Sequence, residues 1–442
     1  MSAPIERPGN PASPSAGGAA RSRRDFLRTG ALLGAACLAP PAAPDPRAAA
    51  PSESPTSRRT PAAAAGRGMR VIVVGAGAFG GWTALHLLRG GADVTLIDAW
   101  GPGNSRASSG GETRVIRAIY GGARRHTLLA ARALALWKEN EARWQQRIHH
   151  RTGALWMFDG PDDYLRASLD DMKEAGLPVR HLERAECARR FPQIRFDGLL
   201  SVHFEPEAGF LMAREACRIV RDAFVSEGGT YLQAAVPPLD PEPGEGLPLL
   251  DGTHLHADRV VLACGAWLSS LLPDLLGSRI HPTRQEVFFF GTPAGDPRFE
   301  EGAMPVWVEI GEEMIYGIPA NGHRGFKCAS DTRGPSFDPT DGERNATEEG
   351  LARARRALAR RFPSLSSAPL LEARVCQYEN SPDGEFILAR HPRRPSLWIL
   401  GGGSGHGFKM GPAIGEHAAQ AILERAEPDP GFSLYRFEAI PS

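Results

Sequence analysis

Three glycines with a fixed spacing, Gly75, Gly77 and Gly80, constrain this chain more than any other feature. They follow directly on an apolar, β-branched run at 70–74, and a helical pattern of apolar residues begins just after them. This order predicts a buried parallel strand, a tight turn and a helix. A second apolar run ends at Asp98, 23 residues after the first glycine. The whole unit is typical of a dinucleotide-binding βαβ fold.

Each residue of this unit has a physical role in holding a dinucleotide. Gly75 makes the tight turn, Gly77 lets the backbone approach the pyrophosphate, and Gly80 lets the helix pack on the strand. The N-terminus of the helix faces the phosphates, and Asp98 can accept hydrogen bonds from ribose hydroxyls. Taken alone, the unit leaves the choice between NAD and FAD open.

Two later segments repeat the combination of a strand and a turn of small residues. Residues 258–267 read as a strand that ends in such a turn, and residues 397–403 read as a strand followed by glycines. A return strand of the first kind, before an excursion into a second domain, is typical of two-domain FAD-dependent oxidoreductases, so it favours FAD. Strand–glycine elements so far apart predict one nucleotide-binding domain that is interrupted by another.

The balance of charges excludes one broad class of protein. The 442-residue chain has 51 basic and 51 acidic residues, so its formal net charge is zero. A strongly basic nucleic-acid-binding protein would carry an excess of positive charge, so we expect no nucleic-acid partner. None of the six cysteines forms a C-x-x-C pair, so we predict no metal site or redox motif.

Lysine is rare among the basic residues. Lys138, Lys173, Lys327 and Lys409 are the only lysines, and the other 47 basic residues are arginines. Because arginine is the default cation here, a retained lysine indicates a position that needs a compact ammonium group. The arginine-rich run 353–361, by contrast, spaces its charges around a predicted helix, so we expect it to form a solvated face.

The first 68 residues have the composition of a targeting segment and linker. Arg23 and Arg24 precede a Phe-Leu pair and an apolar run at about 29–39. This pattern is typical of a twin-arginine export signal, so we expect the twin-arginine export machinery as a partner and a periplasmic or extracellular location. The run is too short to span a membrane. A disordered tail with a chance arginine pair remains the alternative.

Four further motifs resemble the monomeric sarcosine oxidase family, which includes the N-methyltryptophan and pipecolate oxidases and lies in the D-amino-acid-oxidase-like superfamily. In chain order the motifs are Gly111–Arg117 with Tyr120-Gly121, then Tyr316–Pro319 with Lys327, then Cys376–Tyr378 with Ser381–Asp383 and Phe386-Ile387, and finally Ser404–Lys409. Their order and rough spacing match over about residues 70–425. Each motif is unspecific by itself, but together they are specific.

The resemblance implies roles around a flavin. It implies that Cys376 forms a thioether with the flavin, although a buried structural cysteine is the alternative interpretation. It implies that Lys327 lies above the flavin ring and activates oxygen, where a compact cation stabilises the developing negative charge. Arg114 would lie close to the flavin, and the motif around Gly405 and His406 would contact the cofactor.

The resemblance also implies a substrate site. Arg117 and Lys409 would clamp the substrate carboxylate, which is an ordinary use of two converging cations. Tyr316 matches an active-site tyrosine, with a strand aromatic as the alternative. The chain departs from the family at Ser108–Gly110 and at Asp331, where members of the family often have histidine. Asp331 can pair with a lysine or attract a cationic amine, so small N-methyl amino acids are in doubt as substrates.

We therefore expect an α/β fold with a Rossmann-like FAD-binding domain interleaved with a substrate domain on a mixed or antiparallel sheet. The expected division is a signal and linker at 1–68, the FAD-binding domain at 69–150, 206–282 and 372–426, the substrate domain at 151–205 and 283–371, and a C-terminal tail at 427–442.

The expected activity is oxidation of an amino acid or related amine, in particular a secondary or N-methyl amine, to an imine. Electrons pass to FAD, and oxygen then reoxidises it and yields hydrogen peroxide. Two alternatives remain open: an exported dehydrogenase of the same fold that passes electrons to a respiratory acceptor, and a non-catalytic flavin-binding partner protein. The resemblance implies a monomer.

Overall fold

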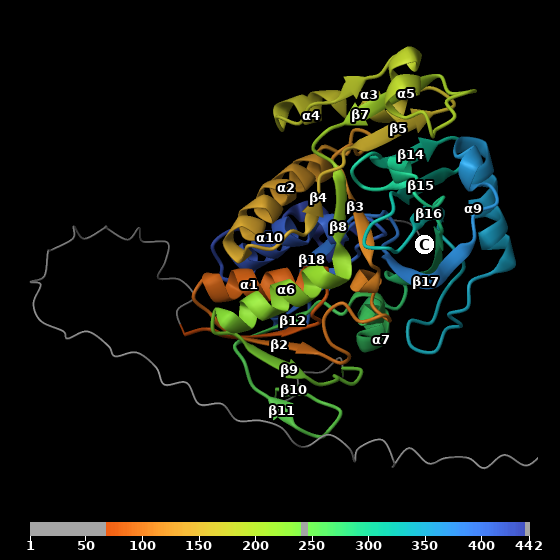
Figure 1. The fold of residues 1–442 in the computed structure, drawn as a ribbon. Coiled ribbons are helices and arrows are strands. Elements are labelled where there is room, and N and C mark those ends of the chain that lie inside the picture. The colour runs from red at the N-terminus through yellow and green to blue at the C-terminus, as the bar shows by residue number, and fades with distance from the viewer. Residues whose placement is uncertain (1–67, 240–245, 438–442) are drawn as a thin grey trace, which may run out of the picture. The chain divides into compact units, whose positions relative to one another are not determined.

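The predicted glycine turn joins β1 (Arg70–Val74) to α1 (Ala78–Arg89) in the computed structural model (Figure 1). The structure describes residues 68–239 and 246–437. The predicted export signal around Arg23 lies outside the described residues. Among the residues described, no helix is both long and apolar enough to cross a membrane.

The glycine turn follows the carboxyl end of β1, an inner strand of a six-stranded sheet. Its strand order is β18-β19-β12-β1-β2-β9, and every pair is parallel except β18 with β19. The further strands are β2 (Asp93–Asp98), β9 (Thr230–Gln233), β12 (Arg259–Leu262), β18 (Ile387–His391) and β19 (Arg394–Gly401). Because all three predicted strand–glycine segments end in this sheet, their turns meet at one edge.

The second large sheet has eight strands in the order β17-β13-β16-β15-β14-β5-β7-β6. It is mixed, because β14 and β5 are parallel and the other pairs are antiparallel. The strands are β5 (Ala154–Phe158), β6 (Arg180–His181), β7 (Ser201–Glu205), β13 (His281–Phe290), β14 (Val306–Ile310), β15 (Met314–Ile318), β16 (Phe326–Ser330) and β17 (Leu370–Asn380). The predicted fold class is therefore confirmed.

Two small sheets and the helices complete the fold. The small sheets are β3-β8-β4, with β3 (Thr113–Ile116), β4 (His149–His150) and β8 (Gly209–Met212), and β10-β11, with β10 (Leu247–Pro248) and β11 (His254–Leu255). The helices are α1, α2 (Arg124–Trp144), α3 (Asp163–Arg166), α4 (Leu169–Glu174), α5 (Arg184–Arg190), α6 (Ala213–Ser226), α7 (Leu268–Leu271), α8 (Pro273–Leu276), α9 (Glu348–Arg361) and α10 (Gly411–Ile422).

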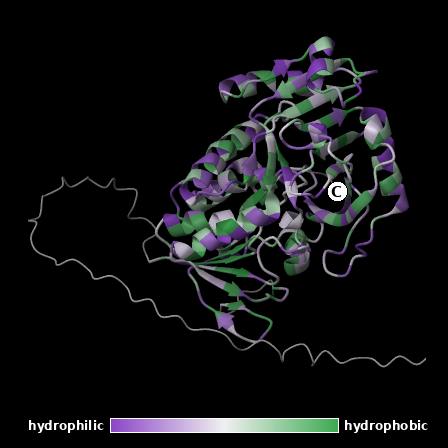
Figure 2. Cartoon of the chain, in the orientation of Figure 1, coloured by the Kyte–Doolittle hydropathy of each residue, from purple (hydrophilic) through white to green (hydrophobic). Residues whose placement is uncertain are grey.

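The six-stranded sheet is covered on both faces. Figure 2 shows the hydrophobic colour along its strands and mixed colours on the helices around them. Helices α1, α6 and α10 pack together on one face, while α7 and α8 contribute apolar side chains to the cluster on the other. A sheet buried on both faces requires continuous apolar strands, and β1 is buried at every position except its first.

Two of the predicted domain boundaries fall inside strands. The boundary at 372 lies within β17, and the boundary at 283 lies within β13. These two strands pair along their length, with Gln285 opposite Cys376. By sheet membership, both strands belong wholly to the eight-stranded sheet, and the division into domains stays a prediction.

A buried ion pair ties α9 to the eight-stranded sheet. Arg361, at the end of α9, donates to the Glu309 carboxylate on β14 at 2.8 Å, and the two residues are only 3% and 1% exposed. Arg361 also donates to the backbone carbonyl of Asp197 at 2.8 Å. The expectation that the arginine run forms a solvated face is therefore wrong for Arg361.

Replacing Arg361 by methionine tests how much this ion pair contributes to the free energy of unfolding. Arg361→Met leaves the Glu309 carboxylate buried without its main cation, so we expect unfolding free energy to fall by about 3–5 kcal/mol in urea titrations. Arg360→Met is the matched control, because Arg360 reaches the same carboxylate at 3.1 Å from an exposed position. The control should cost about 1 kcal/mol or less. Equal losses from the two variants would contradict this account.

Candidate active site

Two of the three motif glycines are required by close backbone contacts. Gly75 has a φ of +106°, and a Cβ there would lie 2.3 Å from the carbonyl oxygen of Ala263 at the end of β12. A Cβ on Gly80 would lie 1.9 Å from the Gly75 carbonyl oxygen. Since both obstacles are backbone atoms, a side chain at either position would push apart β1, α1 and β12.

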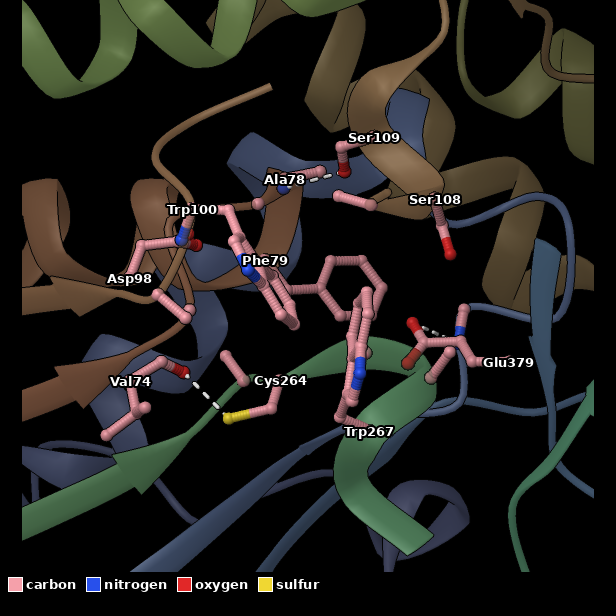
Figure 3. A pocket seen from close by; sticks show the side chains of 18 of the residues that line it. Val74, Ala78, Phe79, Asp98, Trp100, Ser108, Ser109, Cys264, Trp267 and Glu379 are labelled. Atoms are coloured by element: carbon pink, nitrogen blue, oxygen red, sulfur yellow. Dashed lines mark hydrogen bonds between the residues drawn. The ribbon is translucent and has the colours of Figure 1, made fainter. Parts of the chain in front are cut away.

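Gly77 differs from the other two glycines because the space beside it is open. The nearest heavy atom to a Cβ on Gly77 would be the Ser109 Oγ, at 3.4 Å. In front of this glycine lies a cavity of about 340 Å³, which the turns after β1, β2, β12 and β19 surround (Figure 3). Ser109 also accepts a hydrogen bond from the Ala78 N–H, the first residue of α1, at 3.2 Å.

Asp98 lines this cavity and holds the turns around it. Its carboxylate accepts hydrogen bonds from the backbone N–H groups of Ala76 at 2.8 Å, Trp100 at 2.9 Å and Gly101 at 2.8 Å. Burial raises the pKa of Asp98, and these three hydrogen bonds oppose that shift. A carboxylate has about four acceptor positions, so one remains for a hydroxyl group of a ligand.

Two tryptophans that sequence reasoning did not select also line the larger cavity. The rings of Trp100 and Trp267 lie 4.9 Å apart, and the Trp267 indole donates to the Thr340 hydroxyl at 2.9 Å. Their large planar rings are suited to packing against a flat ligand group. Trp100 stands two residues after Asp98, so its place in the sequence could have identified it as a residue of the cofactor cavity.

A smaller cavity of about 70 Å³ adjoins the larger one. The two share the lining residues Arg114, Tyr378, Gly405 and Phe408. The predicted site residues on the wall of the smaller cavity are Arg114, Arg117, Tyr316, Asp331, Cys376, Gly405, His406 and Lys409. The structure thus brings together residues that the sequence scatters over almost 300 positions.

Two cations of the smaller cavity are held by one tyrosine. Lys409 donates to the Tyr120 hydroxyl at 2.9 Å and to the His406 carbonyl at 2.8 Å, while the Arg117 guanidinium lies 4.4 Å from the Tyr120 ring centre. Burial, and next the charge of Arg117, lowers the pKa of Lys409 well below its usual value. An anion that binds between the two cations would therefore stabilise the ammonium form of Lys409.

A carboxylate stands in the same cavity as the cations. Asp331 follows β16 directly, and its carboxylate accepts a hydrogen bond from the Tyr378 hydroxyl at 2.7 Å. Burial raises the pKa of Asp331, whereas Tyr378, Arg117 and Lys409 act against that shift. Tyr316 lines the cavity close by, and burial raises its pKa as well. Sequence reasoning named the motif that contains Tyr378 but gave that residue no role.

Cys376 lines the smaller cavity beside Arg114, a residue that both cavities share. Its Sγ is 3.3 Å from the Arg114 guanidinium, which also donates to the Ser108 carbonyl at 2.5 Å. A Cβ on Gly111 would lie 2.1 Å from the same guanidinium, so the glycine makes room for Arg114. The glycine three residues before Arg114 therefore has a direct steric reason within this chain.

Two predicted residues, Lys327 and His406, do not line the larger cavity. Lys327 is 2% exposed and donates to the Thr113 carbonyl at 3.0 Å, next to Arg114, and its role above the flavin stays a prediction. Burial, and next Arg114, lowers the pKa of Lys327 well below its usual value. His406 lines only the smaller of these two cavities, where its ring packs on Phe386. Its assignment to the cofactor stays a prediction.

Comparison with known families agrees with this arrangement. Residues 70–421 match the family model described as FAD dependent oxidoreductase. The chain belongs to this family. The match spans strands of both large sheets, and it confirms the prediction of an FAD-dependent oxidoreductase.

Curated relatives in this family include amine oxidases. A monomeric sarcosine oxidase from Bacillus sp. (strain B-0618) is 31% identical over 359 residues, which cover 80% of this chain and 92% of the relative. An N-methyl-L-tryptophan oxidase from Salmonella arizonae is 28% identical over 392 residues, which cover 83% of this chain and 97% of the relative. The resemblance to the monomeric sarcosine oxidase family is therefore confirmed.

Solved structures of two other proteins share the fold. The L-proline dehydrogenase from P. horikoshii aligns with a TM-score of 0.72 at 20% identity, covering 84% of this chain and 98% of the other. An Amadoriase I mutant from Aspergillus fumigatus aligns with a TM-score of 0.71 at 24% identity, covering 84% and 90%. Because these sequence identities are below 25%, the comparison shows a shared fold and nothing further.

The residues around the larger cavity fit FAD. Gly77 leaves space before the N-terminus of α1, where a diphosphate would meet the helix dipole. The Ser108 Oγ and the Glu379 Oε2 both lie in the lining residues and are buried without a hydrogen-bond partner among the residues described. Because buried polar atoms in native proteins are nearly always paired, these two indicate a polar ligand in the cavity.

The contrast between Gly77 and Gly80 gives a direct test. We expect Gly80→Ala to lower the unfolding free energy of the apoprotein by about 1–3 kcal/mol, because its methyl group meets backbone. Gly77→Ala should leave that stability within about 0.5 kcal/mol but weaken FAD binding, since its methyl group enters the cavity. Urea unfolding and flavin absorbance measure the two effects. A Gly77→Ala protein that binds FAD as tightly as wild type would contradict the placement of the cofactor.

Proposed function

We propose that the protein oxidises an amino acid or a related secondary or N-methyl amine to an imine and returns the electrons to oxygen, forming hydrogen peroxide. The observation that carries this proposal is that two basic side chains, the half-buried Arg117 and the buried Lys409, line one small cavity together with the carboxylate of Asp331, next to the dinucleotide cavity. The amine oxidases among the relatives support the same reaction class.

The charges of the smaller cavity match a zwitterion. Arg117 and Lys409 offer several N–H donors to a carboxylate, and charge-assisted hydrogen bonds of this kind are strong when they are buried. Asp331, held by Tyr378, offers an acceptor to the substrate nitrogen. A carboxylate at this position favours an amine that arrives with a positive charge or an additional donor group.

FAD, when bound, supplies the two-electron acceptor for the C–N bond. The protein itself binds and orients the substrate and excludes water from the cavity. Arg114 lines both cavities and Cys376 lies beside it, where the reacting part of the cofactor would lie. The free Cys376 thiol at this position supports the proposal of a thioether to the flavin.

The proposal extends to the electron acceptor and the location. The buried lysine Lys327, which donates to the Thr113 carbonyl beside Arg114, supports oxygen as the acceptor, because a compact cation at the reacting atoms would stabilise the charge that develops on reduced oxygen. The pair Arg23-Arg24 and the apolar run after it support export by the twin-arginine route. The name of the related sarcosine oxidase supports a monomer.

The decisive experiment is an anaerobic titration of the purified protein, monitored by flavin absorbance, with amino acids and their N-alkyl derivatives. We expect one of these amines to bleach the flavin band, because the cavity binds its carboxylate and its nitrogen together. The corresponding amines without the carboxylate are the matched controls and should bleach the flavin at least about tenfold more slowly. A yellow protein that none of these amines bleaches would overturn the substrate class.

Replacing Lys327 by methionine separates an oxidase from a dehydrogenase. We expect Lys327→Met to slow reoxidation by oxygen on the order of 100-fold while leaving anaerobic flavin reduction nearly unchanged. Lys138→Met is the control, because Lys138 is an exposed lysine paired with Glu207. If the Lys327 variant recovers in air as fast as wild type, the oxygen assignment fails and the exported dehydrogenase becomes the better reading.

A further inference from the structure

Glu379 on β17 is a buried acid that the substrate chemistry does not use. The residue is 9% exposed and belongs to the lining of the larger cavity. Its Oε1 accepts a hydrogen bond from the Gly403 N–H at 3.1 Å. Its Oε2 is buried and has no partner among the residues described. A carboxyl group thus presents one free, desolvated oxygen to the site of the cofactor.

The free oxygen lies between the turns that follow β12 and β19. The Oε2 would be 3.4 Å from a Cβ on Gly265 and 3.6 Å from a Cβ on Gly401. Figure 3 shows Glu379 and Ser108 across the view from Asp98. Because the Ser108 Oγ also lacks a partner among the described residues, two polar groups of the same wall are left for a ligand.

No cation compensates this carboxyl group within the described part of the chain. The neighbouring residues are uncharged: Gly265 and Leu268 follow β12, Gly403 follows β19, and Pro282 lies opposite Glu379 on β13. The titratable neighbour is the Cys264 thiol, whose pKa is raised first by burial and further by the charges of Asp98 and Glu379. Glu379 therefore has no ion-pair partner here, and ionisation is unfavourable.

A diphosphate in the same cavity would make the charged form of Glu379 still less favourable. Two negative groups in one desolvated space repel each other, whereas a neutral carboxylic acid can donate a hydrogen bond to an oxygen of the ligand. Burial already raises the pKa of Glu379 to about 7 in the protein alone. A bound anionic ligand would raise it further.

We propose that Glu379 is a cofactor-binding acid, which in its protonated form donates a hydrogen bond from Oε2 to an oxygen of bound FAD, with the Ser108 hydroxyl as a second donor. No covalent bond changes in this step. Where Glu379 is ionised in the free protein, FAD binding takes up one proton from solution, and release of FAD returns it. The inference concerns binding of FAD and is independent of the substrate.

The sign of the pH dependence follows from this linkage. Protonation of Glu379 is nearly complete about one pH unit below its pKa in the free protein, so FAD affinity is highest there and falls as the pH rises through and above the pKa. Between about pH 6 and about pH 8.5 the Kd for FAD should rise about 30-fold. FAD itself has no group that titrates between these two values.

The test measures the Kd for FAD at these two pH values in a Cys376→Ala background, where the cofactor stays exchangeable. Fluorescence quenching gives the Kd, and calorimetry in buffers of different ionisation heat gives the proton uptake. Glu379→Gln keeps a donor at the same place but cannot titrate, so its Kd should be nearly independent of pH and its proton uptake near zero. Glu379→Leu should weaken binding about 5–10-fold at the lower pH.

Glu372→Gln is the matched control, because Glu372 lies on the same strand but pairs with Arg374 away from the cavity. It should keep the pH dependence of the unsubstituted background. An equal Kd at both pH values in that background, or a Glu379→Gln variant that retains the pH dependence, would overturn the inference while leaving FAD binding and the proposed reaction intact. A protein that binds no FAD at either pH would overturn both.

Discussion

The close backbone contact between the glycine turn and the end of β12 sets the position of every other part of the site. With a Cβ on Gly75 only 2.3 Å from the Ala263 carbonyl, β1, α1 and β12 must meet at one point. The cavity opens directly in front of this point, and the turn after β19 closes it from the other side. Distances inside the cavity are therefore determined by backbone packing, which is stiffer than any side-chain contact.

The second principle of the site is the burial of charge. Lys327 is 2% exposed and Lys409 is 5% exposed, and each is stabilised chiefly by backbone carbonyls and tyrosine rings. Such groups gain from any ligand that brings the opposite charge, and they disfavour water as a replacement. Asp331 and Glu379 are buried acids in the adjacent walls, so the two cavities differ in the ligands that they favour by charge as well as by shape.

Much of the site could be predicted because its residues occupy turns and strand ends, where spacing along the chain translates into position in space. The glycine turn is the example, whereas a common site for Arg117 and Lys409 was implied by the resemblance to the family. Contacts between side chains from different elements could not be predicted this way. The burial of Arg361 depends on Glu309 of a distant strand, and the hydrogen bond of Lys327 depends on the Thr113 carbonyl of β3.

The alternation of side chains along β17 has a consequence for how such a protein can change during evolution. Cys376 lines the smaller cavity, Tyr378 lines both cavities, and Glu379, of opposite parity, lines the larger one. Substitutions at alternate positions can therefore modify one ligand without the other. An insertion or deletion of a single residue would exchange the two faces at once, so this strand tolerates point mutations but not changes in length.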